Sequence, residues 1–212
     1  MQNQTDVCKI VVGVISPLLS NIYLDPLDHH MADCGYKMIR YADDFVIPCR
    51  TRLEAESALA LVQSWVEEAG LTLHPEKTKI VDVENEGFDF LGYHFEGEHR
   101  WPRKKSFAKL KDSLRAKTKR SNGHSMKYIV DDVSRTLRGW FEYFKHSHPP
   151  RMFRRLDQWV RMRLRSILRK RHKGKGRGRG FDHIRWPNRY FTELGLFSLL
   201  TALVSARQSL RR

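Results

Sequence analysis

The sequence lacks the features that mark membrane, secreted or zinc-binding proteins. Its longest apolar runs, residues 10–19 and 194–204, have about half the length that a helix needs to cross a bilayer. No basic residue precedes Lys9, so the start lacks the positive charge of a secretory signal. The three cysteines are Cys8, Cys34 and Cys49. An odd number cannot all pair, and none shows Cys-x-x-Cys spacing. We therefore expect no membrane span, disulfide framework or zinc site, and a reducing, cytoplasmic location.

Acidic and basic residues are distributed unevenly along the 212-residue chain. Residues 1–100 contain 8 Lys and Arg against 17 Asp and Glu, a net charge of −9. Residues 101–212 contain 31 against 7, a net charge of +24. The positive charges of such a basic segment repel one another unless a polyanion neutralises them. Nucleic acid is the obvious polyanion. With 41% hydrophobic residues the chain is too apolar for general disorder. The sequence thus predicts two parts with different roles.

The first half alternates between helical and strand patterns. Ser16 followed by Pro17 is typical of a helix start, because serine caps helices and proline fits the first helical turn. Residues 51–54 form a capping box for a second helix, which Gly70 can end. Alternating polar and apolar residues predict two hairpins, the first with two acids at its tip. The predicted elements are a helix at 16–33, a hairpin at 36–47, a helix at 51–70, and a hairpin of strands 78–83 and 88–95.

The second half shows helical periodicity throughout. Apolar residues recur at helical spacing around residues 107–114, 126–144 and 152–168, and arginines fill most other positions of the last segment. These patterns predict a helical bundle with one very basic surface. Residues 173–180 alternate glycine with Lys or Arg, which predicts a flexible cationic loop. A weak helix is expected at residues 197–209.

The sharpest local signal is Tyr41-Ala42-Asp43-Asp44, at the tip of the first predicted hairpin. Adjacent carboxylates repel one another, so a divalent cation beside Asp43 and Asp44 would explain their coexistence. All-oxygen ligands suit Mg²⁺, which usually keeps waters and takes phosphate oxygens as further ligands. That preference points to nucleotide chemistry. The alternative is ordinary turn chemistry, since aspartate favours turns.

Four motifs in a fixed order resemble the later palm motifs of reverse transcriptases. They are GVISPLLSNIYL at residues 13–24, YADD at 41–44, LTLHPEKT at 71–78 and FLGY at 90–93. The basic half contains LRGWFEYF at 137–144 and RWPNRYF at 185–191. It resembles the thumb and maturase region of bacterial group II intron-encoded proteins. The resemblance spans residues 13 to 205 or so and implies a bacterial protein.

This resemblance implies roles for individual residues. Asp43 and Asp44 would bind the catalytic Mg²⁺ of a two-metal reaction, in which a primer 3′-hydroxyl attacks a deoxynucleoside triphosphate (dNTP). Tyr41 would lie under the primer terminus. Lys77 would donate a proton to pyrophosphate, with a solvated lysine as the alternative. The residues implied to border the nucleotide and template pocket are Ser16, Pro17 and Asn21. Those implied to form a hairpin that grips the primer are Phe90, Leu91, Gly92 and Tyr93.

The sequence departs from this family near its start. A palm needs a further metal-binding Asp on an earlier strand, and the only acid before the first predicted helix is Asp6, too close to Ser16. Residues 10–13 read IVVG where the family usually has PQGG, so residues 1–12 are interpreted as atypical. We also expect this chain to lack the fingers of the polymerase. We expect a truncated copy that does not polymerise alone, with a complementing N-terminal fragment as one partner.

The basic half is expected to bind RNA. Lys and Arg contacts to phosphates give salt-dependent affinity, and nearby aromatic rings can stack on unpaired bases. By resemblance, the targets are group II intron RNA and, secondarily, a primer-template duplex. For any single arginine the alternative is a solvated helix face. The candidate contact residues are Lys104, Lys105, Arg154, Arg155, Arg161, Arg165 and Arg169.

Together these features predict an α+β fold, in which a partial right-hand polymerase palm precedes an all-α basic thumb/maturase domain. The expected parts are an atypical segment at 1–12, a palm at 13–97, a linker at 98–105, a helical thumb at 106–172, the loop at 173–180 and a tail at 181–212. The implied function is RNA-templated DNA synthesis and splicing assistance for a mobile group II intron. Two alternatives stay open: a non-enzymatic RNA-binding maturase that keeps the palm as a scaffold, and a reverse transcriptase lineage with a role outside introns.

Overall fold

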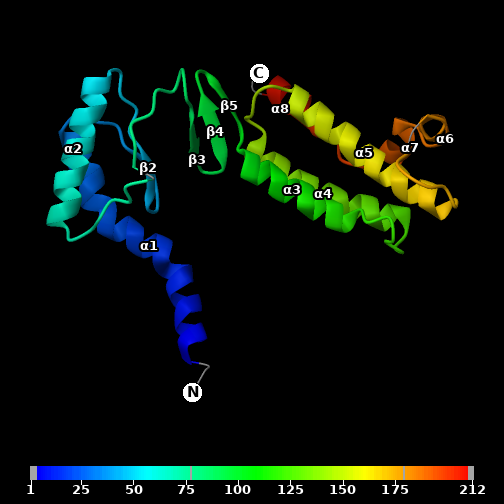
Figure 1. The fold of residues 1–212 in the computed structure, drawn as a ribbon, viewed down its shortest axis with the longest axis horizontal. Helices are drawn as coiled ribbons and strands as arrows, with labels where there is room; N and C mark the ends of the chain where they lie inside the picture. The colour runs from blue at the N-terminus through cyan, green and yellow to red at the C-terminus, as the bar shows by residue number, and fades with distance from the viewer. Residues whose placement is uncertain (1–3, 77, 179, 210–212) are drawn as a thin grey trace. The chain divides into compact units, whose positions relative to one another are not determined.

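The computed structural model describes residues 4–76, 78–178 and 180–209 and combines many helices with two small antiparallel sheets (Figure 1). It divides into two compact units, Met1–Glu86 and Gly87–Arg212, which we call the N-terminal and the C-terminal unit. Each unit is described by itself. Within the described part of the chain, no helix combines the length and apolar character that a bilayer crossing requires.

In its described residues, 4–76 and 78–86, the N-terminal unit consists of two helices and a two-stranded sheet. Helix α1 (Gln4–Asp33) precedes strands β1 (Ile39–Tyr41) and β2 (Asp44–Val46), and helix α2 (Arg52–Glu68) follows. The predicted first hairpin is confirmed, with Ile39 opposite Val46. The predicted capping box is confirmed in its N-cap half, because the Glu54 amide donates to the Thr51 hydroxyl at 3.2 Å. The Glu54 carboxylate accepts from the Arg50 amide at 2.7 Å, one residue before the expected Thr51 amide.

The predicted start of the first helix at Ser16 is wrong. Helix α1 begins at Gln4 and carries both Pro17 and Pro26 inside it. A proline removes one backbone donor and crowds the carbonyl four residues earlier, but it does not compel a helix to begin there. The Ser16-Pro17 pair therefore lies in the interior of a longer helix.

The core of the N-terminal unit lies between its two helices. Leu27 and Met31 of α1 pack with Ala58, Val62 and Val66 of α2, and all five side chains are buried. Partly buried side chains of the hairpin complete this cluster, among them Met38, Phe45 and Ile47. The sheet therefore rests on the helix pair, since a two-stranded hairpin alone is marginally stable in water.

The C-terminal unit opens with a three-stranded antiparallel meander. Its strands are β3 (Phe88–Phe90), β4 (Tyr93–Glu96) and β5 (His99–Pro102), with β4 in the middle. The expected strand at 78–83 is wrong: Asp82 instead accepts hydrogen bonds from the Glu84 amide and the Asn85 side chain, a local turn that competes with strand pairing. The expected linker at 98–105 is wrong too. It contains β5 and the first residues of the next helix, because the chain turns back after Glu96 and pairs with β4.

In the described part of the chain, six helices follow the meander. The periodicity of the second half predicts the three longest and the last of them, but not the two short helices at 182–185 and 188–193. They are α3 (Lys104–Lys117), α4 (Met126–Phe144), α5 (Arg151–Arg171), α6 (Asp182–Arg185), α7 (Asn188–Glu193) and α8 (Leu199–Ser209). Helix α4 presents the buried side chains of Val130, Val133 and Leu137 to one continuous core. Helix α5 adds Phe153, Leu156 and other side chains to the same core. Their apolar stripes face inward, and most of their basic residues are exposed, although Arg165 of α5 is buried.

The loop after α5 packs more closely than its composition predicts. Gly178 is buried, and its amide donates to the Ser166 hydroxyl at 3.2 Å. A Cβ atom at position 178 would lie 2.6 Å from the Cβ of Arg165, so only glycine fits without a shift. Arg169 also donates from Nε to the Lys175 carbonyl at 2.7 Å. The expectation of a freely flexible loop over 173–180 is therefore wrong for its described part, which is held against α5.

Candidate functional site

The Tyr41-Ala42-Asp43-Asp44 motif forms the tip of the β1–β2 hairpin. Tyr41 pairs with Asp44, and Ala42 and Asp43 make the turn between them. Ala42 has a φ of +54°, a left-handed conformation that is uncommon for alanine. The side chains of Tyr41, Asp43 and Asp44 are exposed. Both carboxylates therefore stand at the surface of a tight, conformationally unusual turn.

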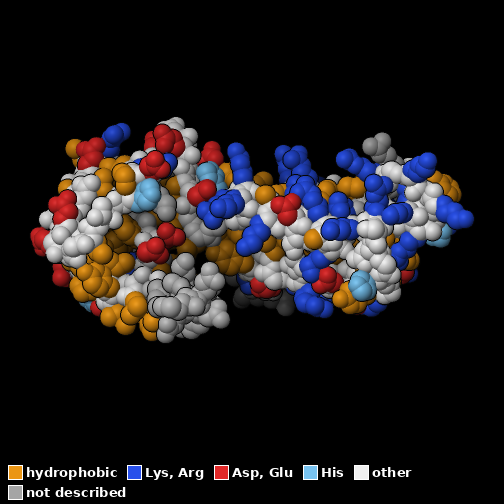
Figure 2. Space-filling model, turned by 60° about the horizontal axis from the view of Figure 1, so that its bottom comes forward, with side chains coloured by type: hydrophobic (Ala, Val, Ile, Leu, Met, Phe, Trp, Pro, Cys, Tyr) orange, Lys and Arg blue, Asp and Glu red, His pale blue; other side chains and the backbone are white. Residues whose placement is uncertain are grey.

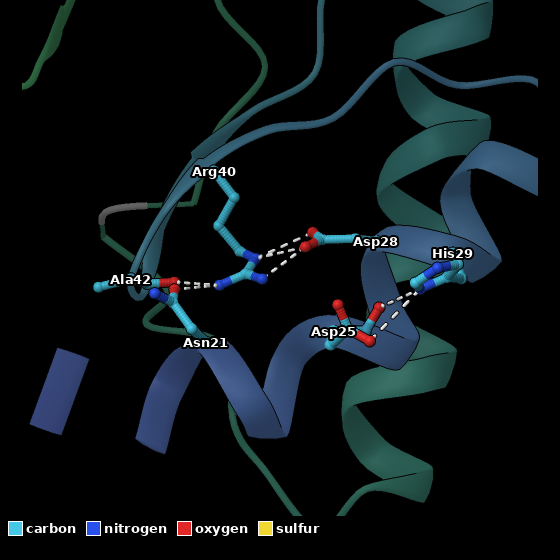
Figure 3. Close-up of polar contacts among 6 residues, drawn as sticks. All are labelled: Asn21, Asp25, Asp28, His29, Arg40 and Ala42. Atoms are coloured by element: carbon cyan, nitrogen blue, oxygen red, sulfur yellow. Dashed lines mark hydrogen bonds and ion pairs between the residues drawn. The ribbon is translucent and has the colours of Figure 1, made fainter. Parts of the chain in front are cut away.

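Arg40 links this turn to helix α1 (Figure 3). Its Nε donates to the Asp28 carboxylate at 2.9 Å, and its Nη1 donates to Asn21 Oδ1 at 3.0 Å and to the Ala42 carbonyl at 2.9 Å. The hydrogen bonds to Asp28 raise the pKa of Arg40, against the opposing effect of burial. One largely buried guanidinium thus connects the helix and the carbonyl inside the turn.

The sequence analysis did not single out Arg40 or Asp28. A signal was available, because Tyr36, Met38 and Arg40 alternate along one face, and all three are partly buried. A charged residue on an inward face needs a partner. The contact to Asn21 brings that predicted residue to the turn through Arg40. Ser16 and Pro17 lie about one helical turn earlier on α1 and are exposed.

Asp43 and Asp44 suit a hard divalent cation but supply only part of a coordination shell. Carboxylate oxygens are the donors that such cations prefer, and six or more ligands complete the shell. Among the described residues, no group of three or more His, Cys, Asp or Glu side chains is placed to hold a metal ion. Lys77, the predicted proton donor, lies outside the described residues. The remaining ligands would have to be waters, substrate phosphates or further protein groups.

The predicted primer-grip residues form the tight turn between β3 and β4, in the C-terminal unit. Phe90 pairs with Tyr93, while Leu91 and Gly92 have φ values of +47° and +80°. Two successive positive φ angles are characteristic of the type I′ hairpin turn, whose twist matches that of the strands. The Gly92 carbonyl accepts from the Arg103 amide at 2.9 Å and from the Ser106 hydroxyl at 3.1 Å. The turn is therefore attached to the start of α3.

Two tyrosines attach the same turn to helix α4. The Tyr143 hydroxyl donates to the Leu91 carbonyl at 2.7 Å, and the Tyr93 hydroxyl donates to the Tyr143 carbonyl. The Tyr93 ring lies 4.9 Å from that of Phe144, centroid to centroid. Burial raises the pKa of Tyr93 above its ordinary value, which further favours the neutral hydroxyl as a donor. The hairpin at 88–96 is thus part of the C-terminal unit, although the sequence predicts it as part of the palm.

The predicted nucleic-acid contacts fall into three groups. Lys104 and Lys105 on α3, and Arg154 and Arg155 on α5, are exposed. Arg161 is partly buried. Figure 2 shows Lys and Arg side chains spread along the visible face of the C-terminal unit. The third group, Arg165 and Arg169, makes contacts within the protein.

Arg165 is a correction to the predicted contact surface. Arg165 is only 3% exposed, and its guanidinium donates to the Trp186 carbonyl at 2.9 Å and to Asn188 Oδ1 at 2.7 Å. Burial lowers its pKa, as does the nearby charge of Arg161. Arg165 therefore joins α5 to Trp186 and to the first residue of α7, and it is not available to a ligand. Arg169 forms an ion pair with Asp182 at 2.6 Å and is partly occupied as well.

Helices α3 and α5 carry a further basic cluster that the sequence analysis did not identify. Lys111, Arg115 and Arg163 all lie within 6.0 Å of the Trp159 ring. Burial lowers the pKa of Arg163, and the positive charges of Arg115 and Arg120 lower it further. Cations held together over an aromatic ring are well placed to receive an anion. Because the four residues come from two helices, their spacing in sequence does not reveal the cluster.

Two family models match the chain. The model for reverse transcriptase (RNA-dependent DNA polymerase) matches residues 12–95, which include the Tyr41–Asp44 turn and the β3–β4 hairpin. The model for the group II intron, maturase-specific domain matches residues 107–186, from α3 to the end of α6. The comparison with curated proteins found no match. The order of the two domains, and the motifs that each contains, agree with the resemblance seen in the sequence. The chain therefore belongs to the group II intron reverse transcriptases/maturases, a family of RNA-directed DNA polymerases.

Proposed function

We propose that the C-terminal unit binds structured group II intron RNA through the exposed basic residues of α3 and α5. The observation that carries this proposal is the division of α5, whose apolar residues are buried while Arg154 and Arg155 stay exposed. The Trp159 cluster adds cations and an aromatic ring next to them. The revised contact set is Lys104, Lys105, Lys111, Arg115, Arg154, Arg155 and Arg161, with a primer-template duplex as a second ligand.

The full chain is expected to bind a folded intron RNA with an affinity that falls steeply as salt is raised. Each neutralised phosphate contributes about −0.9 to the log-log slope for duplex nucleic acid. Replacing Arg154 and Arg155 by glutamine should therefore reduce the slope by about 2 units and leave the thermal stability nearly unchanged. Fluorescence anisotropy over a series of salt concentrations measures the slope, and thermal unfolding followed by circular dichroism measures the stability. A slope near zero for the wild-type chain would contradict the proposal.

Arg165→Gln provides the contrasting variant for this experiment. Because Arg165 is buried and bonded to Trp186 and Asn188, its replacement should destabilise the fold and leave the salt slope of the folded chain intact. Equal slopes for Arg154→Gln/Arg155→Gln and for the wild type would show that Arg154 and Arg155 do not contact the RNA.

Members of this family use a divalent metal, and we propose that Asp43 and Asp44 hold it here as Mg²⁺. Both carboxylates are exposed at the hairpin tip, and Mg²⁺ prefers such oxygen ligands together with water and phosphate. The metal would supply Lewis-acid stabilisation of the charge that develops on the transferring phosphate of a dNTP. Arg40 would keep the turn in place by its bond to the Ala42 carbonyl, and Tyr41 would lie beside the primer end.

The chain by itself is expected to extend a primer on an RNA template no faster than an Asp43→Asn variant. Among the described residues, the two carboxylates alone give a two-metal site too few protein ligands. Without correctly placed metal ions the charge that develops in the transition state is not stabilised, which slows such reactions by large factors. Incorporation of labelled dNTP in Mg²⁺ buffer measures the rate. Incorporation by the wild type clearly above that of Asp43→Asn would contradict the expectation. Activity that appears only when a polypeptide with a further palm carboxylate is added would identify that polypeptide as the complementing partner.

A further inference from the structure

A basic pocket in the C-terminal unit belongs to none of the sites described so far. Its volume is about 510 Å³, within the range of roughly 300 to 1,000 Å³ typical of small-ligand sites. Strand β5, the segment between α4 and α5, and helix α8 form its wall. The lining residues are Arg100, Lys145, His146, His148, Ala206, Arg207 and Ser209. None of these side chains is acidic.

Hydrogen bonds fix the wall of this pocket. Arg100 donates from Nε to the His146 carbonyl at 3.0 Å, and the His148 amide donates to the Arg100 carbonyl at 2.7 Å. Strand β5 and the segment after α4 are therefore tied together at the pocket. The His99 and His148 rings lie 5.9 Å apart, centroid to centroid. Arg100 and His148 are thus positioned by the backbone itself, which favours a site formed before any ligand arrives.

The electrostatic environment of His148 is positive. Partial loss of hydration lowers its pKa, and the charges of Arg207, His99 and Arg100 lower it further. Lys145 forms an ion pair with the exposed Glu142 at 2.9 Å, a contact that water screens. The charged and titratable groups on the surrounding elements are Glu96, Glu98, His99, Arg100, Glu142, Lys145, His146, Arg151 and Arg207. The charges that lower the pKa of His148 are all positive, so the pocket has a field that an anion would neutralise.

We propose that this pocket binds a phosphate group of a nucleotide, with Arg100, Lys145 and Arg207 as its cationic ligands and His148 as a proton-linked donor. The volume exceeds what one phosphate fills and leaves room for the attached sugar or base. A nucleotide unit of the bound RNA strand is the expected source, and in that form the inference rests on the proposed function. A free dNTP offers the same chemistry and forms the second arm of the test.

The proposal makes binding depend on pH through His148. A bound phosphate favours the charged imidazole, so the pKa of His148 rises when the ligand binds. The gain in affinity is complete below the pKa that His148 has in the free protein. It disappears above the pKa that His148 has in the complex. An upward shift of about one unit corresponds to a roughly tenfold increase in affinity across this window. His148→Gln keeps a hydrogen-bond donor but cannot titrate, and its affinity should not change in this way.

The test follows the His148 imidazole signal of the full chain by NMR between about pH 5 and pH 8. Three samples are compared: the protein alone, the protein with a five-nucleotide RNA, and the protein with dATP. The His148→Gln variant assigns the signal. The proposal expects the pKa of His148 to rise by about one unit with RNA. A rise with dATP alone would identify a free nucleotide as the source of the phosphate. Identical titrations in all three samples would overturn the proposal.

Arg207→Gln and Arg189→Gln are matched variants on exposed helix surfaces. Arg207 lines the pocket, whereas Arg189 on α7 donates to Glu193 at 2.7 Å. Arg207→Gln should weaken ligand binding about tenfold and reduce the shift of His148, and Arg189→Gln should change neither. An unchanged shift in Arg207→Gln would overturn the proposal. If RNA bound with a steep salt slope but left His148 unaffected, the proposed function would stand and only the pocket would fail. If RNA did not bind at all, the proposed function would fail and the dATP sample would decide the pocket.

Discussion

Replacing Asp157 by alanine is expected to lower the free energy of unfolding of the C-terminal unit by about 3 kcal/mol. Asp157 on α5 is only 4% exposed. Its carboxylate accepts from the Ser198 hydroxyl at 2.8 Å, from the Leu199 amide at 3.0 Å and from the Leu200 amide at 3.2 Å. Alanine would leave these donors at the start of α8 without their acceptor in a largely buried place, and it would remove a negative charge from a helix N-terminus.

Chemical denaturation, followed by circular dichroism at helical wavelengths, measures this loss. Asp112→Ala is the matched control, because Asp112 lies on α3 in an exposed ion pair with Arg115 and should change stability by less than about 0.5 kcal/mol. Asp157→Asn keeps one acceptor oxygen and should fall between the two. Equal stability of Asp157→Ala and Asp112→Ala would show that the carboxylate does not hold α8.

Asp157 also bears on the proposed phosphate pocket. Helix α8 carries Arg207 to that pocket, and its N-terminus is attached to α5 through Asp157. A variant that loosens α8 should therefore weaken ligand binding at the pocket even though Asp157 is not among its lining residues. Comparing Asp157→Asn with Arg207→Gln separates these effects, because only Asp157→Asn should also lower stability.

The parts of the fold that follow from local patterns were predictable. The apolar stripes of α4 and α5 repeat at helical spacing, and burial of those stripes is what positions both helices. The acidic turn was predictable for a similar reason, since two strand patterns flank Asp43 and Asp44. In each case the residues that determine the structure lie close together in the sequence.

Features that depend on distant partners were not predictable. Arg165 reads as one more surface arginine, and only Trp186 and Asn188, more than 20 residues later, bury it. Asp157 likewise meets its partners about 40 residues away. The erroneous strand at 78–83 has a different cause. The apolar alternation there is overridden by hydrogen bonds that the Asp82 carboxylate accepts from Glu84 and Asn85 in its own turn.

The contact between Arg40 and Asp28 also depends on a partner from another element, and its removal is expected to have the second large effect. Replacing Arg40 by methionine, which preserves the apolar stem, is expected to lower the stability of the N-terminal unit by about 2 kcal/mol. The Arg40 side chain is 9% exposed and that of Asp28 is 35% exposed, so solvent screens part of the loss. The change would remove the bonds to Asp28 and Asn21, and also the bond to the carbonyl of the left-handed Ala42.

A double-mutant cycle separates the pair from its surroundings. Arg40→Met, Asp28→Asn and the combined variant are unfolded in denaturant, and a coupling of at least about 1 kcal/mol is expected between the two sites. Arg52→Met is the control, since Arg52 is exposed and pairs with Glu56 one helical turn away. If Arg40 positions the Tyr41–Asp44 turn, its replacement should also change the NMR signals of that turn, which a loss of stability alone would not do. In folded Arg40→Met, the NMR signals of Asp43 and Asp44 should shift and respond less to Mg²⁺, whereas in folded Arg52→Met they should match the wild type. Unchanged signals in Arg40→Met would limit Arg40 to a structural role.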